Sequence, residues 1–446
     1  KKSAYPFTVD FQNGVKQTRN LTTITSSDGF SYTFQPSSIY VGSNVTTIGS
    51  YAFSFAPLTS IIIPDSVTSI GGYAFVGTNL TSVTIPDSVT SIGGRAFKSC
   101  AGLTSITLPN NVGFTSIVDG TLEGCSNLSS VIIPESVTSI GNNAFYGCTS
   151  LTSITIPNSV ASIATGAFSN CSSLTSVTLP NNVGFTSIEA NVFAQCTDLT
   201  SITIPSSVTN IGNAAFEDTG LTSITIPDSV ASIGSNAFAY CTGLTSVTLP
   251  TNVNFTSIGS YAFYRCAMTS ITIPDSVVSI GGGAFKQCSS LTSINIPNSV
   301  ELLGSYAFQS CSSLTSVTIG NSVTSIGNQA FQGCNSLTSI IIPDSVTSIG
   351  VFAFQNCTDL ASVNLPTNVD FTTIDTSTFR NTGLTSITIP DNVTSIGNGA
   401  FYGYTGLTSI TIGNSVTSIE YRAFYQCISL TSIIIPDSLA SFGTNA

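Results

Sequence analysis

Apolar and polar residues recur in the same order every 22 to 25 residues along most of the chain. In the copy that begins at Leu151, Ile154 and Ile156 alternate with Ser153 and Thr155, which is the period-two pattern of a half-buried β-strand. Each copy therefore predicts one short strand with an apolar side facing inward and a polar side facing outward. We count repeat positions from the leucine as position 0, which puts the outward pair at positions 2 and 4. The copies begin at Leu58, Leu80, Leu103, Leu128, Leu151, Leu174, Leu199, Leu221, Leu244, Met268, Leu291, Leu314, Leu337, Leu360, Leu384, Leu407 and Leu430, after a partial copy at residues 39–53.

The second half of each copy predicts a turn, a second apolar segment and a short helical element. Pro157 ends the strand, because proline cannot donate a hydrogen bond to a β-ladder. Val160 and Ile163 then return apolar side chains to the interior, as a second short strand or arc. The pair Ala-Phe that includes Phe168, followed by Cys171, predicts one helical or 3₁₀ turn before the next leucine.

A fixed period of this length predicts a repeat solenoid, because each copy is too small to bury its own apolar side and must stack on its neighbours. We therefore expect one array of about 18 turns over residues 39–446. Residues 1–38 do not fit the repeat, and their alternating segment AYPFTVDF predicts an N-terminal β-rich cap. The last copy stops at Ala446 before its phenylalanine, so we expect a C-terminal cap to be absent. Four longer copies predict bulges at one corner, around Phe114, Phe185, Phe255 and Phe371.

Composition narrows the classes of function. The net charge of −11 and the pI of about 4.1 argue against nucleic acid and anionic membranes as partners. No apolar run approaches the length of a membrane span. The chain has no histidine, which excludes Ser-His-Asp and Cys-His catalysis and histidine-ligated metal sites. We therefore expect a protein that is not an enzyme and uses no cofactor or metal.

Twelve cysteines share repeat position 20. Their even number would suit a disulfide framework, but other copies carry Thr78, Thr219, Thr382 or Tyr404 in the same place. We favour buried free thiols over disulfides and over a metal-thiolate ladder. Acidic residues recur at position 7 after the proline, as at Asp87, where turn chemistry is favoured over a calcium site.

The outward positions supply the candidate binding residues. Threonine at position 4 forms a column that could contact a partner, although threonine also simply suits an exposed strand. The candidate residues are Thr84, Thr107, Thr155, Thr178, Thr203, Thr225, Thr248 and Thr272. Such a column also resembles the arrays of ice-binding solenoids, but isoleucine interrupts it at Ile62, Ile132, Ile341 and Ile434, which favours a varied contact surface. Tyrosines of the later positions, including Tyr240 and Tyr264, are either binding anchors or packing groups, and Asn20 and Asn254 are candidate glycosylation sites.

The pattern L-x-x-I-x-I-P-x-S-V-x-x-I-G-x-x-A-F-x-x-C resembles the BspA-like (Treponema-type) leucine-rich repeat over about residues 39–446. The resemblance implies a right-handed coil with a parallel β-sheet on one face, on secreted or surface proteins that are often adhesins. It brings no catalytic residue with it, and a fold alone does not assign an activity. We expect a non-enzymatic extracellular or cell-surface scaffold that binds a protein or glycan, for example a host or matrix ligand, through its exposed face. The alternative is a surface-layer or filament subunit that associates end to end through its uncapped C-terminal end.

Overall fold

The computed structural model describes residues 7–10, 16–18, 23–25 and 38–446, which form a parallel β-solenoid of about 18 turns. It contains no helix within those residues, and the predicted fold class is confirmed. The chain divides into two compact units, Lys1–Leu221 (unit 1) and Thr222–Ala446 (unit 2), which are described separately. Much of the predicted cap at residues 1–38 lies outside the described residues, so the cap and its boundary at residue 38 stay predictions.

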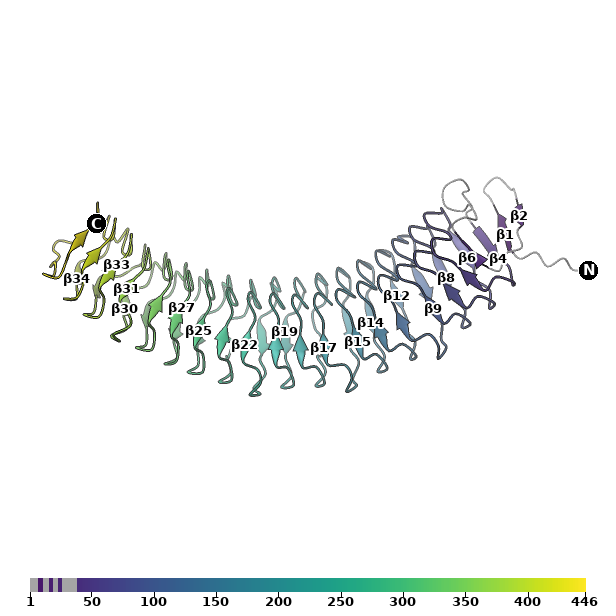
Figure 1. Ribbon diagram of the computed structural model, residues 1–446, viewed down its shortest axis with the longest axis horizontal. Helices are drawn as coiled ribbons and strands as arrows, with labels where there is room; N and C mark the ends of the chain where they lie inside the picture. Colours follow the sequence, from purple (N-terminus) through teal and green to yellow (C-terminus); the bar gives the residue numbers. More distant parts are fainter. Residues whose placement is uncertain (1–6, 11–15, 19–22, 26–37) are drawn as a thin grey trace, which may run out of the picture. The chain divides into compact units, whose positions relative to one another are not determined.

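Repeat positions 2 to 4 of successive turns form a first column of strands (Figure 1). In unit 1 these are β4 (Ser38–Val41), β6 (Ser60–Ile62), β8 (Ser82–Thr84), β10 (Ser105–Thr107), β12 (Ser130–Val131), β14 (Ser153–Thr155) and β16 (Ser176–Thr178). In unit 2 they are β19 (Ser223–Thr225), β21 (Ser246–Thr248), β24 (Ser293–Asn295), β26 (Ser316–Thr318), β28 (Ser339–Ile341), β30 (Ser362–Asn364), β32 (Ser386–Thr388) and β34 (Ser409–Thr411).

Positions 11 and 12 form a second column of shorter strands, where the apolar residue of each pair points inward. In unit 1 these are β3 (Thr23–Ile24), β5 (Thr47–Ile48), β7 (Ser69–Ile70), β9 (Ser91–Ile92), β11 (Ser116–Ile117), β13 (Ser139–Ile140), β15 (Ser162–Ile163), β17 (Ser187–Ile188) and β18 (Asn210–Ile211). In unit 2 they are β20 (Ser232–Ile233), β22 (Ser257–Ile258), β23 (Ser279–Ile280), β25 (Leu302–Leu303), β27 (Ser325–Ile326), β29 (Ser348–Ile349), β31 (Thr373–Ile374), β33 (Ser395–Ile396), β35 (Ser418–Ile419) and β36 (Ser441–Phe442).

Strands of neighbouring turns pair in parallel and in register, so equivalent residues lie side by side. In β8 and β10, for example, Thr84 pairs with Thr107. Near the N-terminus the pairing changes, because β1 (Phe7–Asp10) is antiparallel to both β2 (Lys16–Thr18) and β4. The described residues of this region therefore add two antiparallel strands at the end of the first column.

The segment from position 13 to position 20 consists of hydrogen-bonded turns, so the predicted helical or 3₁₀ element is wrong. In the turn that begins at Leu58, Tyr73 and Gly77 have φ angles of 57° and 66°, in the left-handed region. The residues between them are not left-handed, and this alternation directs every second N–H group away from its own turn. The amides of Tyr73, Phe75 and Gly77 donate to carbonyls of the next turn at 3.1, 2.7 and 2.8 Å. A helix would have kept those donors for itself.

Phenylalanine at position 17 forms a stacked column through the interior. In unit 2 the ring of Phe308 lies 5.3 Å from Phe285 and 5.4 Å from Phe331, with interplanar angles of 7°. Its side chain is fully buried, like those of its neighbours. In unit 1 Leu122 takes the place of a phenylalanine and is fully buried as well. The column thus accepts a smaller apolar residue.

The four longer copies bulge at the corner after the first strand, as predicted. Phe114 is buried in the place that a valine occupies in the shorter copies. Its carbonyl accepts the Ser136 hydroxyl at 2.8 Å, and in a shorter copy the Val67 carbonyl accepts the equivalent Ser88 hydroxyl at 2.7 Å. The Asn111 side chain accepts the amides of Gly113 and Phe114 at 2.8 and 3.0 Å, which holds the bulge. Val112 stands at its tip, 95% exposed. The extra residues therefore change the outline of the solenoid and leave its interior intact.

Replacing Phe308 with alanine should lower the free energy of unfolding by about 3–5 kcal/mol, because it leaves a cavity between two stacked rings. Phe308→Leu should cost less, since Leu122 shows that the column accommodates leucine. Urea denaturation followed by circular dichroism, with hydrogen exchange to locate the loosened turns, would measure both effects. Equal losses for the two variants would contradict the importance of the ring stack.

Candidate functional site

The side chains at positions 2 and 4 of the first strand column form a surface that we call the strand face. All eight threonines predicted from the sequence are exposed on it or beside it. Three pairs lie side by side in register, namely Thr84 with Thr107, Thr155 with Thr178, and Thr225 with Thr248. Thr203 and Thr272 are exposed but lie in segments outside the strands.

Two hollows lie on the strand face of unit 1, and both are lined by Thr107. The larger, of about 760 Å³, lies along β6, β8 and β10 and also includes Ile62, Thr84 and the carboxylate-bearing residue Asp87. The smaller, of about 330 Å³, lies along β10 and the residues after β12, where it includes Ile132. Strand side chains thus meet a carboxylate-bearing turn at one edge of the face.

The two isoleucines give the hollows an apolar character that the threonine column lacks. Ile62 is 61% exposed and Ile132 is 85% exposed, although both belong to the residue type that most often fills a protein interior. The sequence reveals these breaks in the column, but it does not reveal the hollows. Their walls are formed by side chains from neighbouring turns, so they follow from the register between copies.

The hydroxyls of Thr84 and Thr107 form no hydrogen bond within the described part of the chain, whereas threonines at position 1 are already engaged. Thr104, for instance, donates its hydroxyl to the carbonyl of Thr81 at 3.0 Å. The position-4 hydroxyls can therefore bond to a partner without breaking a bond that holds the turns together.

The cysteine column belongs to the interior, and its thiols are free and bonded to the backbone. Eleven of the twelve are buried, and only Cys427 is partly exposed. The Cys125 thiol donates to the carbonyl of Phe97 in the previous turn at 3.1 Å, and Cys334 donates to Phe308 at 3.2 Å. Burial raises the pKa of Cys148 and Cys357 to about 12 and that of Cys427 to about 11. These residues form a hydrogen-bonded ladder of buried thiols, in which Cys100 differs because its hydrogen bond with Cys125 lowers its pKa.

Four of the acidic residues at position 7, Asp87, Asp228, Asp344 and Asp391, bond to the backbone of the next turn. A carboxylate oxygen of Asp87 accepts the amide of Asn110 at 2.8 Å, and one of Asp228 accepts the amide of Thr251 at 2.6 Å. Asn158 bonds to the next turn in the same way, at 2.7 Å. Since a neutral side chain performs the same role, these contacts fit turn chemistry.

The structure describes only one of the two candidate glycosylation sites. Asn254 is exposed in a corner bulge, where its amide donates to the Asn252 side chain at 2.8 Å. Asn20 lies outside the described residues. Glycosylation stays a prediction at both positions.

In-register parallel strands, a buried leucine and isoleucine interior, and an inward hydrogen-bonding ladder define a solenoid of the leucine-rich repeat type. The model of the BspA-type leucine-rich repeat region matches residues 22–149, 96–222, 167–256, 256–372 and 372–446. The chain therefore belongs to the BspA-type leucine-rich repeat family, a family of repeat scaffolds. Among curated proteins none matches the chain.

Several solved structures are similar to this chain. A leucine-rich repeat protein from Bacteroides ovatus is 27% identical with a TM-score of 0.56, over 96% of this chain and 92% of that one. A leucine-rich cell-surface protein from Faecalibacterium prausnitzii is 29% identical with a TM-score of 0.47, over 92% and 94% of the two chains. A leucine-rich repeat protein from T. pallidum is 30% identical with a TM-score of 0.32, over 41% of this chain and 82% of that one. Separately, the described residues include no helix able to cross a lipid bilayer.

The buried thiols should resist modification while the protein is folded. Because the thiolate is the reactive form, and the pKa of Cys148 is about 12 against an ordinary value of 9.0, a thiol reagent at pH 8 should label at most the partly exposed Cys427. All twelve cysteines should react in 6 M guanidinium, taken as about the concentration that unfolds stable domains. Mass spectrometry of the labelled protein would count them, and rapid labelling of several cysteines in the native state would contradict the buried ladder.

The same pKa shift predicts loss of stability at alkaline pH. Above about pH 9 the unfolded chain loses thiol protons that the folded chain keeps, so the unfolded state is favoured as the pH rises. The contribution is complete below pH 9.0 and is lost as the pH approaches 12. Urea midpoints measured between pH 7 and 10.5, compared with those of a Cys148→Thr variant, should fall more steeply for the unaltered protein; a midpoint that does not change with pH would count against this expectation.

Proposed function

We infer that this protein is a non-enzymatic binding scaffold of the extracellular space or cell surface, and that it contacts a protein partner through the strand face of unit 1. Membership of the BspA-type family supports a scaffold role. The location follows the family expectation that these proteins are secreted or displayed on cells.

The observation that carries the proposal is the pair of adjoining hollows with Ile62 and Ile132 on their walls. Protein interfaces combine an apolar, well-packed centre with a polar rim that supplies hydrogen bonds. The hollows offer both, since the exposed isoleucines lie near the unengaged hydroxyls of Thr84 and Thr107. Asp87 and Glu135 add carboxylates to the linings, which favours a partner surface that carries basic or hydroxyl groups.

A glycan is a weaker candidate for this particular face. Sugar chains are held by rows of hydrogen-bonding side chains or by stacking on aromatic rings, and the two linings contain isoleucine, valine, leucine and proline between their polar residues and no aromatic residue. A protein side chain, in contrast, fits an apolar hollow bordered by hydroxyls.

The variant Ile132→Lys should weaken binding to a protein partner at least tenfold, because it places a charge in the smaller hollow. Ile341→Lys is the matched control, since Ile341 holds the same repeat position in unit 2, is 70% exposed and lines neither hollow. Purified extracellular-matrix proteins immobilised on a sensor surface provide the panel of partners, and surface plasmon resonance gives the dissociation constants.

If both lysine variants weaken binding equally, or if neither does, the partner does not bind at these hollows. Failure of the unaltered protein to bind any member of the panel would count against a matrix ligand. Light scattering on the same samples tests the filament alternative, in which fibres appear as the protein concentration rises.

A further inference from the structure

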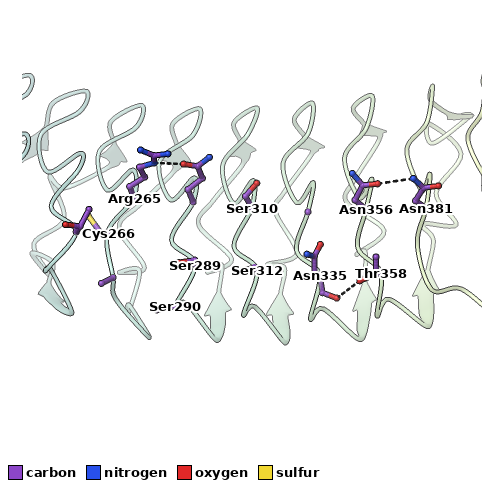
Figure 2. Close-up of a pocket in the computed structure, with 14 residues that line it drawn as sticks. Arg265, Cys266, Ser289, Ser290, Ser310, Ser312, Asn335, Asn356, Thr358 and Asn381 are labelled. Carbon is purple, nitrogen blue, oxygen red and sulfur yellow. Dashed lines mark hydrogen bonds between the residues drawn. The ribbon is translucent and has the colours of Figure 1, made fainter.

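Unit 2 contains a polar trough that is separate from the strand face. Its volume is about 1070 Å³, and residues at positions 19 to 22 of seven successive turns line it, if the extra residues of the longer copies are not counted. Figure 2 shows Arg265 at one end and Asn356 and Asn381 at the other. The trough therefore extends along seven turns, which suits an extended molecule better than a compact one.

The lining is suited to hydrogen bonding throughout. Of its 14 residues, 11 carry a hydroxyl, an amide or a guanidinium group, and none carries a carboxylate. This is notable in a chain with a net charge of −11. The nearest acidic residue in sequence, Asp359, follows Thr358 toward the end away from Arg265. The trough is thus neutral along its length and positive at the Arg265 end.

Arg265 is held in place without a carboxylate partner. Its Nε donates to the Gln287 side-chain oxygen at 2.6 Å, and its guanidinium lies 5.6 Å from the ring centroids of both Tyr240 and Tyr264. The two rings meet edge to face, with centroids 4.9 Å apart. Among the described residues, every ion pair involves Glu123 of unit 1, so Arg265 is left with its charge uncompensated.

A second cation extends this positive end. The ammonium of Lys286, in the next turn, lies 5.9 Å from the Tyr264 ring and 5.2 Å from the Tyr306 ring. Aromatic rings hold a cation without neutralising it, unlike a carboxylate. Arg265 and Lys286 therefore place two positive charges beside each other, of which Arg265 lines the trough and Lys286 lies next to it.

The side chains of the trough recur at the spacing of the turns, which is about 4.8 Å between parallel strands. That spacing is comparable to the length of one residue in an extended sugar chain. Amide and hydroxyl groups at this repeat match sugar hydroxyls, so the trough would hold a sugar chain by hydrogen bonds, since its lining contains no aromatic residue. A guanidinium additionally recognises a carboxylate or sulfate through paired hydrogen bonds.

We propose that the trough binds an extended acidic glycan, with a carboxylate or sulfate of the glycan at Arg265 and its hydroxyls along the serine and asparagine side chains. This site is independent of the protein-binding role of unit 1. A nucleic acid is a poorer fit, because a phosphate on every residue would meet cations at one end alone.

Titration calorimetry with defined polymers tests the proposal and separates its possible ligands. Polygalacturonate carries carboxylates, dextran sulfate carries sulfates, dextran is neutral, and poly-glutamate is an acidic polymer without sugar. We expect at least one of the two acidic polysaccharides to bind at least tenfold more tightly than dextran and poly-glutamate. Equal binding of poly-glutamate would overturn the glycan assignment, and no binding of either acidic polysaccharide would overturn the site.

Two variants locate the binding, each with a matched control. Ser312→Tyr should obstruct the trough and weaken binding at least tenfold, whereas Ser172→Tyr should not, although both serines follow the column cysteine in the same local sequence, CSSLTSVT. Arg265→Gln should weaken binding of the acidic polymer, and glutamine already occupies this left-handed position at Gln287. Arg422→Gln should leave it unchanged, because Arg422 also lies over tyrosine rings but outside the trough.

Circular dichroism and hydrogen exchange verify that each variant is folded. Equal effects of Ser312→Tyr and Ser172→Tyr, or of Arg265→Gln and Arg422→Gln, would overturn the placement. Ile132→Lys should leave polysaccharide binding intact, so that failure of the strand-face proposal is distinguishable from failure of this one.

Discussion

The hydrogen bonds between successive turns are the constraint on which the rest of this structure depends. Each turn of 22 to 25 residues is too short to bury its own apolar side, so its stability comes from its neighbours. At positions 15 and 19 the backbone adopts left-handed conformations, as at Tyr306 and Ser310, which cost about 1–2 kcal/mol for a residue other than glycine. The amides of these two residues donate to the next turn at 2.8 and 2.7 Å, and the buried rings stack behind them. The cost is thus offset by contacts that exist only when turns are stacked.

Much of this arrangement can be predicted from the sequence, because the repeat shows each position many times. Isoleucine at positions 3 and 5 and phenylalanine at position 17 are buried, and threonine at position 4 is exposed, as the alternation requires. The left-handed turns could not be predicted in this way. Tyr306 and Phe352 are bulky residues that rarely adopt positive φ, so the Ala-Phe segment reads locally as helical. The tertiary contacts between turns override that local preference.

The candidate sites are harder to predict than the fold, for a related reason. A hollow such as the one that Ile132 lines is formed by side chains of different copies, and it appears only when the copies are placed in register. The trough of unit 2 leaves no distinct signal in the sequence either, because positions 19 and 21 lack acidic residues in nearly every copy, with Asp218 of unit 1 as the exception. The bulge residues themselves, with Val112 exposed at a tip, are absent from the linings of both hollows and of the trough.

Within each turn, most of the atoms that bond neighbouring turns together differ from those that form the surface. This difference explains how such a uniform scaffold can carry distinct surfaces. The bonds that hold the turns together come from the backbone, from buried thiols and from short polar side chains such as Ser88, which donates to the Val67 carbonyl at 2.7 Å. Side chains at position 4 take little part in that bonding, and at position 19 only some do, such as Arg265 with Gln287, so both positions vary without disturbing the stack. Threonine gives way to Ile132 on the strand face, and the column that contains Ser310 contains Arg265 two turns earlier. Because surface and scaffold depend on different atoms, recognition can change from turn to turn while the interior stays the same.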